Sequence, residues 1–134
     1  MQHPNEATIK AIYDDIAAGS LDRVASFLAD DITWQITGKS PISGIYVGKD
    51  AVLGFFAKMG ELYGGTFSIE IRDVLADEAY GAVIATERGM VGGQALEFGS
   101  VHLWSLRGGK CASFISYEDD HYHQFWARQS RSVA

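Results

Sequence analysis

The segment from Leu28 to Phe56, LADDITWQITGKSPISGIYVGKDAVLGFF, decides how this chain folds. Apolar and polar residues alternate over residues 32–37, which is the pattern of a β-strand with one buried face. Residues 38–48 contain a proline and three glycines, so we expect a loop built from turns. An aromatic helix then begins at Lys49. We expect this segment to form the mouth and one wall of an apolar pocket that a curved sheet closes.

Two short helices are predicted before this segment. Apolar residues recur at three- and four-residue spacing from Ile9 to Ile16, with Asn5 as the N-terminal cap and Gly19 as the stop. A second helix begins after Ser20 and ends near Asp30. The third helix, from Lys49, carries an apolar stripe up to the glycine pair at residues 64–65. Amphipathic helices of this kind need an apolar surface to lie against.

Four strands are predicted after the third helix, over residues 66–75, 79–90, 95–106 and 111–117. The turns between them are short, so neighbouring strands pair antiparallel as a meander. The second and third strands are apolar on both faces, and helices can cover only one of these faces. We therefore expect a homodimer through the convex face of the sheet, with a closed monomeric barrel as the alternative. A short helix follows Asp119, and the tail after Gln129 is expected to fray.

The composition restricts the class of protein. A length of 134 residues with 47% hydrophobic side chains suits a single domain spanning 1–134. A net charge of −6 argues against binding to nucleic acid or to an anionic membrane. The single cysteine, Cys111, has no intramolecular disulfide partner, and no apolar signal segment opens the chain. We therefore expect a cytoplasmic protein.

The order of these elements, α-α-β-α-β-β-β-β, makes the chain resemble a known family. It is similar to the SnoaL-like and ketosteroid-isomerase-like members of the nuclear-transport-factor-2-like superfamily. The resemblance rests on Tyr13 and on motifs at residues 18–22, 28–34, 41–52, 109–110 and 116–119. It implies an α+β fold, a cystatin-like cone in which a strongly curved mixed or antiparallel sheet wraps around the N-terminal helices.

The resemblance also implies a pocket and its residues. Glu118 and Glu87 are the candidate acid/base groups, and Tyr13 is a candidate hydrogen-bond donor. A single bulge would place Arg88 instead of Glu87, or His102 instead of Val101, in the pocket. Without such a bulge, His102 suits a histidine that is hydrogen-bonded within the sheet or at an interface. The remaining implied ligand-binding residues are Trp34, Ile36, Phe56, Met59, Ala85, Val101, Leu103, Phe114 and Ser116.

The chemistry of the best-known relatives does not carry over directly. The position of the ketosteroid-isomerase-like base is Ile36, and the position of the acid in their oxyanion hole is Val101. The motif at residues 86–88 looks like part of the Asp-Arg-Asp set of limonene-epoxide hydrolases, but the two aspartate positions fall on Met90 and Ser116. Two inward glutamates would suit proton transfer. Alternatively, one faces solvent or pairs with a neighbouring arginine.

Two classes of function follow from these observations. The first is a cofactor-independent isomerase, cyclase or hydrolase that acts on a hydrophobic alicyclic or polyketide-like molecule. The second is a non-catalytic protein that binds a small hydrophobic ligand in the same pocket, and a protein–protein module is a third interpretation. We expect no cofactor. We also expect no metal site, because His121 and His123 would point apart on a helix and no third fixed ligand accompanies them.

Overall fold

Four helices are present in the computed structural model, which describes residues 3–132 and side chains for residues 3–129. They are α1 (Pro4–Ala17), α2 (Leu21–Phe27), α3 (Lys49–Tyr63) and α4 (Asp120–Ser132). The N-terminal cap of α1 is His3, whose Nδ1 accepts from the Asn5 backbone N–H, and Pro4 occupies the first helical position. The predicted cap Asn5 lies inside the helix. Within the described residues, no helix is both long and apolar enough to span a membrane.

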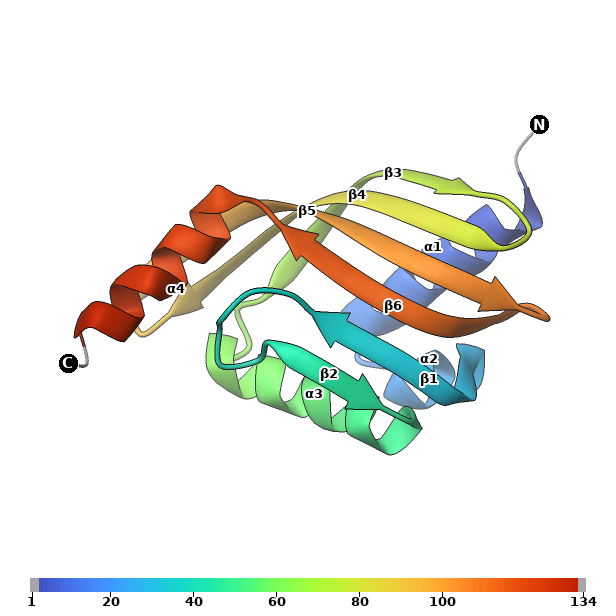
Figure 1. Cartoon of the computed structure of the whole chain (residues 1–134), viewed down its shortest axis with the longest axis horizontal. Coiled ribbons are helices and arrows are strands. Elements are labelled where there is room, and N and C mark those ends of the chain that lie inside the picture. Colours follow the sequence, from blue (N-terminus) through green and yellow to red (C-terminus); the bar gives the residue numbers. More distant parts are fainter. Residues whose placement is uncertain (1–2, 133–134) are drawn as a thin grey trace.

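Six strands form one curved sheet in the order β2-β1-β6-β5-β4-β3 (Figure 1). The strands β3 to β6 form the predicted antiparallel meander, and β1 joins it in parallel with β6. The described architecture confirms the predicted α+β class. The strand bounds are β1 (Leu28–Ile36), β2 (Gly44–Val47), β3 (Ser68–Ala76), β4 (Tyr80–Val91), β5 (Gln94–Arg107) and β6 (Lys110–Glu118).

Two boundaries differ from the sequence prediction. The strand β1 begins at Leu28 rather than Ile32, and a register shift between Leu28 and Thr33 interrupts the alternation that a regular strand would show. The predicted loop contains the edge strand β2, which pairs antiparallel with β1. Gly44 is its first residue and Gly48 follows its last, and these turn signals concealed a strand that has no buried residue.

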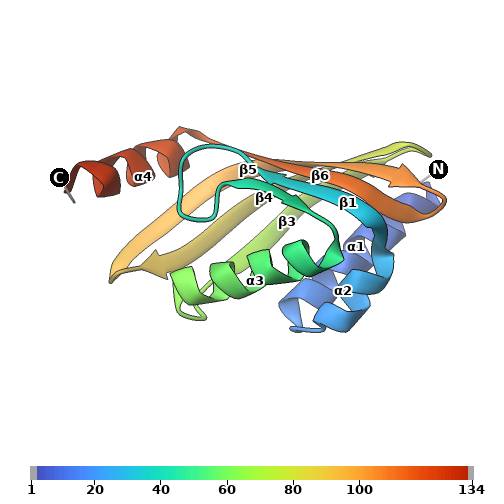
Figure 2. The ribbon, with the colours of Figure 1, turned by 60° about the horizontal axis from the view of Figure 1, so that its bottom comes forward.

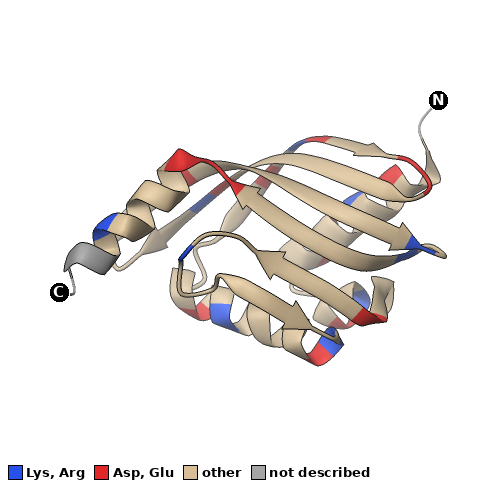
Figure 3. Ribbon diagram, viewed as in Figure 1, with Lys and Arg blue, Asp and Glu red and all other residues tan. Residues whose placement is uncertain are grey.

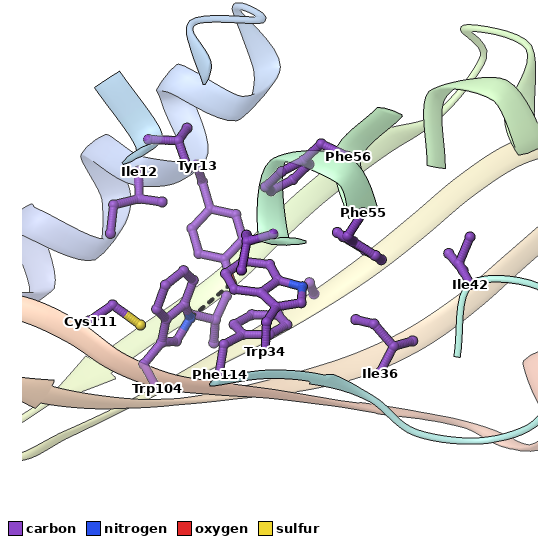
Figure 4. Close-up of a cluster of buried hydrophobic side chains, with 14 of the residues drawn as sticks. Ile12, Tyr13, Trp34, Ile36, Ile42, Phe55, Phe56, Trp104, Cys111 and Phe114 are labelled. Carbon is purple, nitrogen blue, oxygen red and sulfur yellow. Dashed lines mark hydrogen bonds between the residues drawn. The ribbon is translucent and has the colours of Figure 1, made fainter. Parts of the chain in front are cut away.

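The helices α1, α2 and α3 lie against the concave face of the sheet, whereas α4 lies at one end of the molecule (Figure 2). Between the helices and the sheet is an aromatic cluster in which rings contact edge to face or stack. The members drawn in Figure 4 include Tyr13, Trp34, Phe55, Phe56, Trp104 and Phe114. The candidate site is built into this cluster.

The curvature brings Gly89 of β4 under the ring of Tyr63, leaving no room for a side chain. Gly89→Ala is therefore expected to lower the free energy of unfolding by about 1–3 kcal/mol, because the new methyl group overlaps a buried ring. Gly54→Ala is the matched control, since a Cβ there meets open space on α3. This control should raise stability by roughly 0.5–1 kcal/mol through helix propensity. Urea denaturation of both variants measures the two changes, and a neutral Gly89→Ala would contradict the close approach.

Candidate functional site

A β-bulge determines which residues of β5 face the helices. Arg107 pairs with Lys110 across the turn, but Ser105 pairs with Ser113, so one extra residue of β6 is accommodated between them. The extra residue breaks the alternation of β6, in which Cys111 and Phe114 both face inward, and it shifts by one position which residues of β5 lie opposite the inward residues of β6. His102 is only 4% exposed and faces the interior, whereas Val101 is 43% exposed on the convex face. The prediction that Val101 and Leu103 line the pocket is wrong for this reason.

A small cavity of about 50 Å³ lies within the aromatic cluster. It adjoins a groove of about 560 Å³ between α1, α3 and β3. The cavity and groove share Ile16, Phe56, Met59, Phe67 and Ile69 as lining residues. Trp34, Ile36, Phe55 and Phe56 of the segment from Leu28 to Phe56 line the cavity, whereas the adjoining groove lies between α1, α3 and β3.

Eight of the predicted site residues line the cavity: Tyr13, Trp34, Ile36, Phe56, Met59, Glu87, Phe114 and Ser116. Their roles in binding or catalysis stay predictions. Ala85 is buried but is not on the cavity wall, and Glu118 lies two residues beyond Ser116 along β6, opposite Ser100. Arg88 lies on the opposite face of β4 and pairs with Glu97, so Glu87 is the residue that faces inward.

Four polar side chains of the cavity, those of Tyr13, Glu87, His102 and Trp104, form one hydrogen-bonded chain. The Trp104 indole N–H donates to the Tyr13 hydroxyl over 3.1 Å (Figure 4). The same hydroxyl lies 2.6 Å from Nδ1 of His102, and Nε2 of His102 lies 3.3 Å from Glu87 Oε2. Two strands, β4 and β5, and the helix α1 contribute to this chain, which joins residues up to 91 positions apart. Burial makes each of these hydrogen bonds stronger than it would be in water.

One arrangement of hydrogens satisfies the members of this chain. An indole N–H can only donate, so the Tyr13 oxygen accepts from Trp104, and Nδ1 of His102 is the acceptor within reach of the Tyr13 hydrogen. With Nδ1 accepting, the imidazole hydrogen is on Nε2, which lies 3.3 Å from both Glu87 Oε2 and Ser100 Oγ. Burial raises the pKa of Tyr13 well above its usual value, so its hydroxyl remains a neutral donor.

Only one oxygen of Glu87 is engaged in this chain. Oε2 accepts from His102, whereas Oε1 makes no hydrogen bond to any side chain or backbone group of the described residues. Glu87 as a whole is 8% exposed and lies on the wall of the cavity. A carboxylate with one oriented oxygen and one available oxygen in apolar surroundings can accept a proton from a bound molecule.

A family comparison fits this geometry. The profile of the SnoaL-like domain matches residues 9–114, which is most of the chain. The chain belongs to the SnoaL-like family. No curated protein sequence matches it. The SnoaL-like fold places it among small-molecule-binding domains.

Solved structures similar to this SnoaL-like protein share its fold. A cystatin-like protein of unknown function from Xanthomonas campestris is 25% identical, with a TM-score of 0.83 over 94% of this chain and 98% of that one. TerC, co-crystallised with polyporic acid, is 20% identical, with a TM-score of 0.81 over 94% and 99%. A candidate SnoaL-like polyketide cyclase from Jannaschia sp. CCS1 is 15% identical, with a TM-score of 0.76 over 91% and 90%.

Glu118 of the SnoaL-like domain forms a second carboxyl site beside the cavity. Ser116 Oγ donates to its Oε1 over 3.0 Å, and Thr37 Oγ1 lies 2.9 Å from its Oε2. Burial raises the pKa of Glu118 to about 7, opposed by the hydrogen bonds from these two hydroxyls. The Thr37 hydroxyl oxygen also lies 2.8 Å from the Ser116 carbonyl oxygen, so its single hydrogen is shared between this oxygen and Glu118 Oε2.

This raised pKa makes the stability of the SnoaL-like domain depend on pH. Since folded Glu118 holds its proton more tightly than the unfolded chain does, stability is expected to fall as pH rises from 4.5 to about 7. The loss is at most about 1.4 kcal/mol per pH unit. Urea denaturation at several pH values measures it. In Glu118→Gln the amide cannot titrate, so the slope in this window should flatten, and an unchanged slope would contradict the assignment.

Among the described residues, no three His, Cys, Asp or Glu side chains gather as metal ligands would. His123, a candidate ligand type in the sequence, instead directs Nε2 toward the backbone oxygen of Glu118. Sequence reasoning assigned no chemical role to His102. The only indication in the sequence that His102 faces inward was the alternative of a single bulge. Both faces of β5 carry apolar residues, so the alternation along the strand does not show which face is buried.

Proposed function

We propose that this SnoaL-like protein binds a small hydrophobic alicyclic molecule in its cavity and transfers a proton on it without a cofactor. Glu87 is the proposed base, and the single observation that carries this role is its unpaired Oε1 on an apolar cavity wall. His102 is a positioning residue, because it holds Oε2 and is itself held by Tyr13. The carboxylate would take a proton from carbon, and the electron pair would move onto an adjacent carbonyl.

The size of the cavity limits how a ligand enters. A volume of about 50 Å³ accommodates a few waters or part of one ring. A ligand of two or more rings would extend into the adjoining groove and displace the side chains of Phe56 and Met59, which line both spaces. A polyketide-like ligand is consistent with the fold neighbours, one described as a polyketide cyclase and one bound to polyporic acid.

Glu118 has an indirect place in this proposal. It does not line the cavity, but Ser116 does, and the Ser116 hydroxyl donates to Glu118. A pKa of about 7 lets Glu118 hold or release a proton near neutral pH. We expect it to tune the polarity of the wall at Ser116 rather than to contact the reacting atoms.

The experiment uses 1-tetralone, a bicyclic ketone with acidic C–H bonds beside its carbonyl. In D₂O the proposed base should exchange these hydrogens for deuterium faster than buffer does, which mass spectrometry measures. Binding without exchange would overturn the catalytic proposal. That result would favour the non-catalytic binding alternative, which is supported by Ile36 on the cavity wall at the position where ketosteroid-isomerase-like enzymes carry their base.

We also propose that two copies pair through the convex face of the sheet. The exposed large hydrophobic residues lie on this face by strand register, and the row Ile84, Val101 and Tyr117 crosses three neighbouring strands. This row contains no charged residue, and the ion pairs of Arg88 with Glu97 and Glu70 lie on the same face four residues further along β4 (Figure 3). A contiguous apolar surface of this kind is typical of a protein interface.

Val101→Lys is expected to convert the proposed dimer into a monomer, because it places a charge at the centre of the interface. Sedimentation velocity measures the change in mass. Ala57→Lys is the matched control, since it adds the same charge to the exposed side of α3 and should leave the mass unchanged. A wild-type protein that sediments as a monomer at all concentrations would contradict the proposed pairing.

A further inference from the structure

Trp34 carries a buried donor that the protein does not use. Its side chain is 2% exposed, and its Nε1 has no hydrogen-bond acceptor among the described residues. Trp104, which contacts the same ring edge to face, donates its own N–H to Tyr13. Leaving a buried N–H unpaired destabilises a protein, so such groups are uncommon.

The orientation of the Trp34 ring is determined by its neighbours. Phe114 stacks on it with ring centres 3.8 Å apart and planes within 14°. Phe55, Phe56 and Trp104 contact its other sides. The nitrogen edge is turned toward Ile36 and Phe55, away from Trp104 (Figure 4). Trp34, Ile36 and Phe55 all line the cavity, so the packing holds the N–H edge at the cavity wall, beside apolar side chains.

We infer that the Trp34 N–H binds the oxygen of a ligand, and that the ligand is a cyclic compound bearing a carbonyl group. An indole N–H can only donate, so it selects a hydrogen-bond acceptor. A carbonyl oxygen is an acceptor that carries no hydrogen, so it needs no acceptor in return. The apolar walls select the ring. This inference rests on the proposed function and deepens it, because a carbonyl is also the group that acidifies the C–H bonds facing Glu87.

The test compares two probes of nearly equal shape. One is 1-tetralone, and the other is 1-methylenetetralin, in which a CH₂ group replaces the carbonyl oxygen. Wild-type protein should bind the ketone more tightly, and Trp34→Phe should reduce that preference about three- to tenfold, the effect of one hydrogen bond. Trp126→Phe is the matched control, since Trp126 also has a buried, unpaired Nε1 but does not line the cavity.

A second measurement does not depend on how the variants fold. The chain has three tryptophans, so the wild-type spectrum contains three indole N–H resonances. The ketone should move the Trp34 resonance downfield, and the alkene should not.

The Trp34→Phe protein without ligand should also melt at the same or a higher temperature than wild type, because the change removes an unpaired buried donor.

The outcomes separate this inference from the proposed function. If Trp34→Phe leaves the preference for the ketone unchanged and the wild-type resonance does not move, the ligand role of Trp34 is overturned, while proton exchange by Glu87 can still be observed. If the Trp34 resonance responds and no exchange occurs, the anchoring role stands and the catalytic proposal fails. If neither probe binds wild-type protein, both are overturned.

Discussion

Replacing Glu87 by glutamine is expected to slow the deuterium exchange of 1-tetralone by about 10²–10⁴-fold, the usual contribution of a positioned general base. Glutamine keeps the size of the side chain and can still accept from His102 through its amide oxygen. It cannot take up a proton at the position of Oε1. The rate of exchange should therefore collapse while binding of the ketone changes little, and mass spectrometry and calorimetry measure these two quantities separately.

Glu97→Gln provides the control for this variant. Glu97 is an exposed acid on the neighbouring strand, and it pairs with Arg88 on the outer face. Glu97→Gln therefore changes the net charge of the protein by the same amount as Glu87→Gln, but it leaves the cavity unchanged. Its exchange rate should match that of wild type. A Glu87→Gln protein that exchanges at the wild-type rate would show that another group, with Glu118 the next candidate, acts as the base.

The sequence was sufficient to predict the framework around this site. Helical spacing located α1 and α3, the change to period-two alternation located the four-stranded meander, and the order of elements identified the family. These features depend on many residues at once, so a boundary error of a few positions at Leu28 or Gly44 did not change the fold. They also placed Tyr13 and Trp34 on elements that do meet in the cavity.

The inner face of β5 could not be predicted in the same way. Both faces of this strand carry apolar residues, one facing the helices and the other forming the proposed dimer surface, so alternation does not mark the interior. One extra residue in β6 then decides between Val101 and His102. A bulge of this kind depends on backbone pairing, which leaves little trace in residue type. The histidine that holds Glu87 was therefore assigned no chemical role.

The aromatic cluster is what keeps these polar groups in place, and Phe114 is its central contact. Its ring stacks on Trp34 and also contacts Trp104 and His102. Phe114→Ala is expected to lower the free energy of unfolding by about 3–5 kcal/mol, because it removes a buried ring and leaves a cavity that its rigid neighbours cannot fill. Urea denaturation measures this loss. Phe114→Leu keeps most of the apolar volume and should cost less than about 1.5 kcal/mol.

The same variant tests whether packing or hydrogen bonding orients the site. In Phe114→Ala the Trp34 ring loses its stacking partner, so its N–H should no longer be held toward a ligand, and the ketone should lose its advantage over the alkene. The enlarged apolar space should bind benzene and regain part of the lost stability, as dry engineered cavities do. If Phe114→Ala costs less than about 1 kcal/mol, the ring is not tightly packed. Trp34 would then lack the rigid support on which its proposed role depends.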